Sequence, residues 1–545
     1  MSVLQPTFTP PAERRSVLDR AHVGDIEGAL GTVPSFDTGP RRSLLRRLAT
    51  LLAIMGPGLI VMVANNDAGG ISVYAEAGQN HAASLLWVLL LLAPVLFINQ
   101  EMVARLGAVS GAGHARLIVE RFGRHWGAFA IGDLLALNAL TIVTDFIGVA
   151  LALGFLGVSR YLAVPIAAAL LVAITASGSF RRWERMMYLL VAVSFAVIPL
   201  AIISHGAHGG GVSAGLHSGG EGGFSSTFVL LIIALAGTTV APWQFFFQQS
   251  NVIDKRITPR WLSYERLDTL LGAVLIVLGA AAVMLTCAWA FGGTPLHGAF
   301  DDAGTIAEGL RVAVSPLAGT LFAIVLLNAS LLGAAAVTLA SSYAVGDYFG
   351  FKQSLHRSWR DATYFHGTFA ALVVVAATVV LIPGSPLGLI TTGVQALAGV
   401  LLPSASVFLL LLCNDREVLG PWVNPRWLNA IGTGVVGVLV VLSTVLTITT
   451  IFPGADVGAL SLALFAALGL ALAGMAVGAA RTRPQRPGSE MTRAERHDWT
   501  TPPLEALPPP PASRARRLAL ILLRLQLVIA VTLLLTKLVQ LGLGS

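Results

Sequence analysis

Long apolar segments alternate with short polar stretches along most of the chain, from about residue 48 to residue 480. A helix of about 20 apolar residues crosses the hydrocarbon core of a bilayer, and twelve segments approach or exceed that length. They lie near residues 48–78, 83–107, 127–157, 161–178, 186–204, 226–250, 268–292, 317–347, 363–383, 386–413, 427–452 and 457–479. The pattern predicts an all-α polytopic membrane protein with about twelve transmembrane helices.

Composition agrees with this interpretation. The chain of 545 residues is 55% hydrophobic and only 12% charged, with a mean hydropathy of +0.77. So few charges cannot cover the surface of a soluble protein of this size. Cys287 and Cys413 both lie in apolar runs and predict neither a disulfide framework nor a cysteine-rich metal site. The sequence has no P-loop, nucleophile elbow or His-Glu-x-x-His pattern, so no enzymatic activity is expected.

The position of the basic residues explains the net charge of +7. Lys and Arg gather in every second loop, for example at 41–47, 180–185, 254–260 and 352–360, whereas the alternate loops hold almost none. The positive-inside rule then places the N-terminus and the segment after the twelfth span in the cytoplasm, with the protein in the cell membrane. The charge therefore indicates topology, and no nucleic-acid partner is expected.

The two ends of the chain differ in amino-acid composition from the transmembrane domain, which is predicted at 47–480. Residues 1–46 are polar and lack the apolar core of a signal peptide, which predicts a flexible cytoplasmic tail. Residues 481–516 are rich in Pro and charge, as is typical of an extended linker. Residues 517–545 are apolar with interspersed basic residues, and either span the membrane once more or lie as an amphipathic helix at its surface.

A polar stretch, Asn-Asn-Asp-Ala-Gly-Gly at residues 65–70, interrupts the first apolar segment. In hydrocarbon every main-chain donor and acceptor must be satisfied, so an unwound segment persists only where it lines a cavity or meets a ligand. The carboxylate of Asp67 costs at least about 2.5–3.5 kcal/mol at this depth, and an acid with carbonyl neighbours suits a cation. The structural alternative is a helix kink in which Asp67 bonds to a neighbouring helix.

The sixth segment is interrupted by Gly-Thr-Thr-Val-Ala-Pro at residues 237–242. The proline lacks an N–H and clashes with the preceding turn, which leaves carbonyls near Thr238 free. Two discontinuous helices, one opening each set of five spans, are typical of inverted-repeat transporters with a site at the membrane midplane. We therefore expect repeats at about 47–205 and 226–413, extra spans at 427–479, and contact between the two breaks.

These segments resemble a known family. Residues 56–70 are similar to the first span of the natural resistance-associated macrophage protein (NRAMP) divalent metal transporters, whose motif is Asp-Pro-Gly-Asn. Further similarity to the second, third, fifth and tenth spans of that family lies at 101–111, 144–153, 181–190 and 401–420. The resemblance covers roughly residues 45–450. It implies a LeuT-like 5+5 inverted repeat that imports a divalent cation by alternating access.

The resemblance also implies a set of metal-site residues. Asp67 corresponds to the metal-binding aspartate of the family, and Ala64 and Thr238 correspond to its carbonyl donors. Gln395 corresponds to a glutamine that the tenth span brings near the ion. No resident cofactor is implied, because the ion is the cargo. The expected partners are this ion and the lipid bilayer, and the sequence does not set the oligomeric state.

Several positions depart from the family pattern. Gly70 replaces the asparagine ligand and Ala241 the methionine, and the loss of a soft thioether favours a hard ion bound by oxygen and water. This pattern resembles the NRAMP-related magnesium transporters, and Mn²⁺ is also expected to pass. Asp145 is retained as a candidate proton or pathway residue, but Gly148 replaces a glutamate and Trp243 a histidine. Import driven by the membrane potential, without protons, is therefore expected.

Other functions stay open at this point. If the change at Ala241 is neutral, the protein is a proton-coupled Mn²⁺ or Fe²⁺ importer. From a different class, it is a metal-gated sensor that does not translocate ions and uses the Pro-rich tail as its output. Deleting residues 481–545 discriminates between these classes, since a carrier should keep its transport. An amino-acid carrier is disfavoured because Asp67 would repel a substrate carboxylate.

Overall fold

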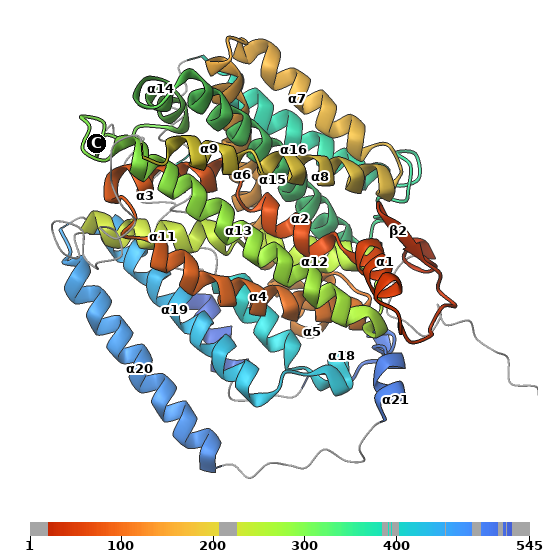
Figure 1. Cartoon of the computed structure of the whole chain (residues 1–545). Helices are drawn as coiled ribbons and strands as arrows, with labels where there is room; N and C mark the ends of the chain where they lie inside the picture. The colour runs from red at the N-terminus through yellow and green to blue at the C-terminus, as the bar shows by residue number, and fades with distance from the viewer. Residues whose placement is uncertain are drawn as a thin grey trace, which may run out of the picture.

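The computed structural model describes residues 20–206, 226–383, 391, 394, 403–452, 454–481, 492–510, 516–518 and 520–525. It is a bundle of long helices packed around two short, discontinuous ones (Figure 1). The helices are α1 (Leu44–Ile54), α2 (Pro57–Ala64), α3 (Ala68–His81), α4 (Leu86–Ser110), α5 (His114–Phe122), α6 (Arg124–Phe155), α7 (Arg160–Thr175), α8 (Phe180–Ser194), α9 (Val197–Ser204), α11 (Ser226–Thr239), α12 (Pro242–Asp254), α13 (Leu262–Phe291), α14 (Ala303–Ala313), α15 (Pro316–Phe349), α16 (Thr363–Leu381), α18 (Arg416–Leu419), α19 (Arg426–Ile451), α20 (Val457–Arg481) and α21 (Arg493–Asp498). The strands are β1 (Ile26–Gly28) and β2 (Gly31–Val33).

Within the described residues, nine helices are long and apolar enough to cross a membrane, or up to ten if α1 and α2, bent by 52°, form one span. Two shorter apolar helices, Arg160–Thr175 and Pro403–Cys413, coincide with the predicted fourth and tenth spans. Much of the predicted tenth span, 386–413, lies outside the described residues. The count of twelve therefore stays a prediction, as does the topology of residues 526–545, which also lie outside.

The broken helices occupy the centre of the bundle. All eight residues of α2 are buried, and α13 packs against α2, α3 and α4. Helices α15 and α6 pack along each other, and α15 also contacts α2, α3 and α12. In contrast, α20 lies at the edge of the molecule beside α19 (Figure 1). The unwound backbone between α2 and α3 is therefore surrounded by protein and kept away from lipid, as its unpaired polar groups require.

The described part of the N-terminal segment, residues 20–46, forms secondary structure that packs against the bundle, and the predicted flexible tail does not anticipate this. β1 and β2 form an antiparallel hairpin in which Ile26 pairs with Val33. In the turn, the N–H of Ala29 donates to the carboxylate of Glu184 on α8 at 2.5 Å. The Nε of Arg256, just after α12, donates to a carbonyl at residue 21 at 2.9 Å. These partners lie far away in sequence, so a local polar pattern does not reveal them.

Part of the Pro-rich C-terminal segment is also packed against the bundle. Thr501 is fully buried, and its hydroxyl donates to the carbonyl of Val418 at 2.6 Å. The guanidinium of Arg496 lies over the ring of Trp422, 4.4 Å from its centroid. Residues 492–510 therefore do not form the extended linker that the sequence predicts. Deleting this segment would remove packing contacts as well as any signalling role, so it cannot by itself separate a carrier from a sensor.

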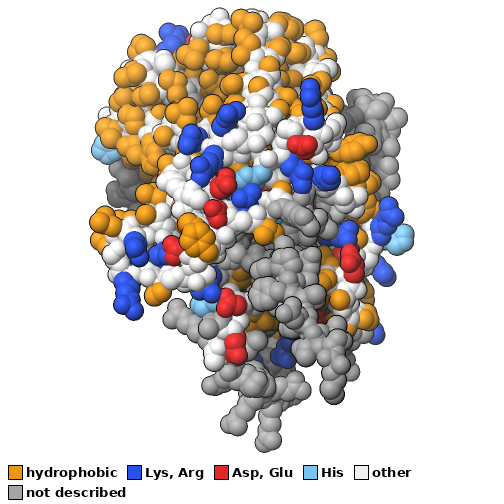
Figure 2. All heavy atoms as spheres, turned by 90° about the vertical axis from the view of Figure 1, so that its right-hand side faces the viewer, with side chains coloured by type: hydrophobic (Ala, Val, Ile, Leu, Met, Phe, Trp, Pro, Cys, Tyr) orange, Lys and Arg blue, Asp and Glu red, His pale blue; other side chains and the backbone are white. Residues whose placement is uncertain are grey.

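Basic side chains are spread over the side of the molecule that carries α1, the hairpin and α21 (Figure 2). This side is called the basic face below, and the opposite side, where α14 lies, the α14 face. Arg42 and Arg46, at the start of α1, are exposed there. Such a face suits the cytoplasmic side of a membrane protein. Its orientation toward the cytoplasm stays a prediction.

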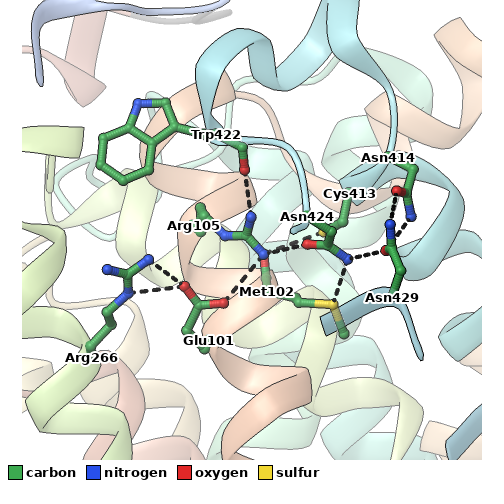
Figure 3. A network of polar contacts seen from close by, with 9 residues as sticks. All are labelled: Glu101, Met102, Arg105, Arg266, Cys413, Asn414, Trp422, Asn424 and Asn429. Atoms are coloured by element: carbon green, nitrogen blue, oxygen red, sulfur yellow. Dashed lines mark hydrogen bonds and ion pairs between the residues drawn. The ribbon is translucent and has the colours of Figure 1, made fainter. Parts of the chain in front are cut away.

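A buried polar network fastens the chain around α18 to the bundle near the basic face (Figure 3). Arg105 of α4 donates to the carbonyl of Trp422 and, at 2.6 Å, to Oδ1 of Asn424. It also pairs with Glu101 at 3.2 Å, and Glu101 accepts from Arg266 of α13 at 2.7 Å. Because a buried guanidinium needs most of its donors paired, this arrangement fixes α4, α13 and the chain around α18 relative to one another.

Candidate functional site

The two helix breaks meet inside the bundle, which confirms the predicted contact between them. Asn65, between α2 and α3, donates through Nδ2 to the carbonyls of Thr238 at 2.9 Å and Thr239 at 2.7 Å. Both acceptors lie at the end of α11, next to the second break. The side chain of Asn65 is only 1% exposed. A single buried amide therefore joins the first repeat to the second.

Each break alters the hydrogen bonding of one carbonyl that the sequence assigns to the site. In a continuous helix the N–H of Ala68 would donate to the carbonyl of Ala64. It donates instead to Oδ1 of Asp145 on α6, at 3.2 Å. The carbonyl of Thr238 has no helical donor, because Pro242 stands four residues later. It is nevertheless not free, since the amide described above occupies it.

Asp67 is buried at the start of α3. Its Oδ1 accepts the N–H of Gly70 at 2.7 Å, which makes Asp67 the N-cap of this helix. The positive end of the helix also favours a carboxylate at this position. A methyl group on the Cα of Gly70 would lie 3.2 Å from the carbonyl oxygen of Asn65, 3.4 Å from the Thr238 hydroxyl and 3.5 Å from Asp67 Oδ1. Three oxygens, contributed by both breaks, therefore surround the position that a side chain at residue 70 would occupy.

Glycines let two helices approach the first break closely. A methyl group on Gly333 of α15 would lie 2.6 Å from the Cβ of Asp67 and 2.8 Å from Oδ1 of Asp145. A methyl group on Gly148 of α6 would lie 2.2 Å from the hydroxyl oxygen of Ser330. The position that a Cβ would take at residue 148 is therefore occupied by neighbouring atoms.

The other predicted positions contribute little polar chemistry. Ala241 lies at the second break, where its N–H donates to Oε1 of Gln244 at 3.2 Å. Its side chain offers only a methyl group. Trp243 is buried and packs edge-on against Phe247, with ring centroids 6.0 Å apart. Gln395 lies outside the described residues, so its place near the ion stays a prediction.

A cavity of about 280 Å³ connects the region of the first break with the α14 face. Ala68 and Gly148 line it beside the break, while Asp301 and Asp302, just before α14, line its other end. Glu76 of α3 lines it as well. A cavity needs only about 10–15 Å³ to hold one water. This one therefore has room for an ion together with several waters.

Buried ion pairs and hydrogen bonds fasten the helices to one another near the basic face. Lys255, directly after α12, forms an ion pair with Glu184 of α8 at 2.5 Å, and both side chains are fully buried. Lys255 also donates to the carbonyl of Met55. Asp268 of α13 accepts the N–H of Gly58 at 2.7 Å, at the start of α2. These bonds hold the first and sixth spans against α8 and α13, and the cavity of about 280 Å³ described above lies toward the α14 face.

Two residues of this site are not singled out by the sequence pattern. Asn65 reads as part of the unwound backbone, although its amide bridges the breaks. The carbonyls that the second break frees need a hydrogen-bond donor. This requirement is the feature of the sequence that could have indicated the role of Asn65. Gly333 lies in an alanine-rich helix, where no local feature indicates a close approach.

Comparison with known proteins places the chain in a family. The model of the natural resistance-associated macrophage protein-like family matches residues 58–449. The divalent metal cation transporter MntH 1 of Pseudomonas aeruginosa is 28% identical over 411 residues, which cover 73% of this chain and 91% of the relative. The divalent metal cation transporter MntH of Levilactobacillus brevis is 24% identical over 417 residues, covering 74% and 90%.

Solved structures share the fold. The manganese transporter of Eremococcus coleocola, in complex with an aromatic bis-isothiourea substituted compound, matches with a TM-score of 0.61 at 21% identity, covering 81% of this chain and 96% of that one. A Na⁺-coupled sialic acid symporter in a substrate-bound outward-open state matches with a TM-score of 0.50 at 12% identity, covering 77% and 89%. These matches confirm the predicted all-helical, LeuT-like membrane fold. The family match includes both breaks and the helices around them, and the chain belongs to the natural resistance-associated macrophage protein-like family.

Proposed function

We propose that this protein imports a hard divalent cation, Mg²⁺ or Mn²⁺, by alternating access. The observation that carries the proposal is the group of three oxygens around Gly70, which come from Asp67, Asn65 and Thr238. Two of its relatives are named divalent metal cation transporters, and a structure of the same fold is named a manganese transporter. These names support the class of cargo.

The donor chemistry supports a hard ion. A carboxylate, a main-chain carbonyl and a hydroxyl are all oxygen donors, and Mg²⁺ is usually bound through one or two carboxylates while it keeps several waters. The methyl group of Ala241 replaces any soft donor at the second break. Among the described residues, no group of three or more His, Cys, Asp and Glu side chains could hold a metal ion. One carboxylate with neutral oxygens and water then remains as the ion's environment.

The surroundings of Asp145 support transport without protons. Its Oδ1 accepts the N–H of Ala68, which gives this carboxylate a structural role at the break. Neither Gly148 nor Trp243 can carry a proton, and α16, which packs against α6, contains no Asp, Glu, Lys or Arg; its one histidine, His366, has its Nε2 3.1 Å from the carbonyl of Arg357. A membrane potential supplies about 2.3 kcal/mol per charge per 100 mV, or about 4.6 kcal/mol for a divalent ion. The potential alone is therefore a sufficient driving force for uptake.

A proton-coupled importer is the second candidate, and one observation favours it. Gly333 lies within contact distance of both Asp67 and Asp145, so the two carboxylates are close neighbours across α15. Protonation of one would then change the affinity of the other for a cation. This candidate differs from the first in a single observable, the movement of protons with the metal.

Competition between ions tests the proposed cargo. Proteoliposomes that contain the purified protein should take up Mn²⁺, and a large excess of external Mg²⁺ should suppress most of this uptake. The physical reason is that the oxygen donors around Gly70 do not distinguish strongly between these two ions. Liposomes without protein give the background. Mn²⁺ uptake that is unaffected by any excess of Mg²⁺ would contradict the proposal of a hard-ion site.

A further inference from the structure

Asn65 takes part in the first break in three separate ways. Its Nδ2 bridges the carbonyls of Thr238 and Thr239. Its own carbonyl oxygen belongs to the group of oxygens around Gly70. Its Oδ1 is buried, and within the described residues no hydrogen bond reaches it. Each of these roles uses a different atom of Asn65.

The orientation of Thr238 follows from the bridge. The amide of Asn65 engages the carbonyl of Thr238, while the hydroxyl of Thr238 borders the space at Gly70, 3.4 Å from the position of a methyl group there. The ion therefore meets a hydroxyl from the sixth span, and the carbonyl is held by the amide. A hydroxyl both donates and accepts hydrogen bonds, so it can bind a water of the ion's hydration shell, whereas a carbonyl is a stronger direct ligand for a bare cation.

The unpaired amide oxygen of Asn65 also favours an ion that keeps its hydration shell. Leaving a buried acceptor without a donor costs about 1–3 kcal/mol. A metal-bound water is a strong donor, because the cation polarises its O–H bonds. A hydrated ion beside Asp67 can supply such a donor to Asn65, whereas a bare ion can satisfy the amide oxygen only by coordinating it directly.

We propose that Asn65 is the positioning residue that makes this site selective for a divalent ion that keeps its water. The amide holds the Thr238 carbonyl away from the ion, and the amide oxygen accepts from the ion's hydration shell. This inference rests on the proposed function and deepens it. Mg²⁺ gives up its waters reluctantly, whereas Ca²⁺ exchanges them for protein oxygens more readily. Asn65 therefore favours Mg²⁺ over Ca²⁺.

The test compares ion selectivity in N65A and N65L with that in N66A. N65A removes the bridge, and N65L removes the polar atoms while keeping a similar side-chain shape. Asn66 is the matched control, because it is an amide in the same break whose Nδ2 donates to the carbonyl of Ile276 on α13, at 3.1 Å. Two quantities are measured, the inhibition of Mn²⁺ influx by Mg²⁺ and by Ca²⁺, and the rise in Tm that each ion produces in detergent solution.

The Mg²⁺ to Ca²⁺ selectivity ratio is expected to fall by about tenfold in both Asn65 variants, as is usual when a residue that supports a metal site is lost, and to stay unchanged in N66A. If N65A and N65L lower the Tm or the influx but leave the ratio as in wild type, Asn65 is only a structural bridge and the inference is overturned. A wild-type protein that binds the ions without moving them would instead contradict the proposed transport. In that case the ratio of the Tm shifts still decides the role of Asn65.

Discussion

Replacing Asp67 with asparagine should lower Mn²⁺ influx by about 100-fold or more. Asparagine keeps an oxygen that can accept the N–H of Gly70, so α3 can still begin at residue 67. The substitution removes the only formal charge among the three oxygens around Gly70. Loss of a residue that merely supports a metal ligand costs about 10–100-fold in affinity, so loss of the charged ligand itself should reach at least the upper end of that range. Initial influx rates into proteoliposomes measure the effect.

The matched control for this variant is Asp302→Asn. Asp302 lines the cavity that reaches Ala68 beside the first break, but its carboxylate caps α14 by accepting the N–H of Thr305 at 2.8 Å. Asparagine is an equally good N-cap, so this variant should keep most of its influx. Thermal unfolding of both variants checks that folding is preserved. Influx of Asp67→Asn within a few-fold of wild type would show that the ion does not depend on this carboxylate.

The second large effect is expected for Gly333→Ala. The new methyl group would lie 2.6 Å from the Cβ of Asp67 and 2.8 Å from Oδ1 of Asp145. Both distances are below normal contact, so α3 or α6 must shift away from α15. Overpacking of this kind costs about 1–3 kcal/mol. We expect a lower Tm and, because the carboxylate of Asp67 moves with its backbone, an influx reduced by about ten- to a hundredfold.

Gly132→Ala is the control for this prediction. Gly132 lies in α6, and a methyl group there meets no atom within 4 Å. Alanine favours a helix over glycine by about 1 kcal/mol, so this variant should be as stable as wild type or slightly more stable. If Gly333→Ala keeps the Tm and the influx of wild type, as is expected for Gly132→Ala, then α15 does not approach Asp67 and Asp145 as closely as described.

The sequence alone was sufficient to predict the two breaks, their contact and the candidate role of Asp67. A carboxylate and paired glycines at membrane depth are costly, as is a proline within a span, so each is informative without knowledge of its neighbours. The resemblance to the family added Ala64 and Thr238 as carbonyl donors. In the structure both carbonyls lose their helical donors, through Asp145 and Pro242, but the carbonyl of Thr238 accepts the amide of Asn65 instead.

The features that were not predicted all depend on distant partners. The bridge from Asn65 joins residues 173 positions apart, and the hairpin at 26–33 is held by Glu184 and Arg256. A polar, Pro-containing segment is typical of a disordered tail unless such partners exist. The close approach at Gly333 likewise depends on how α15 packs against two other helices. Local patterns carry no information about such packing.

The most direct test of the account is to record Mn²⁺ influx and internal pH together in proteoliposomes with a potassium diffusion potential. We expect that an inside-negative potential accelerates the influx, that excess Mg²⁺ suppresses it, and that the lumen does not acidify as Mn²⁺ enters. Acidification in step with Mn²⁺ entry, which persists when the potential is held at zero, would contradict potential-driven transport. It would identify the protein as a proton-coupled importer.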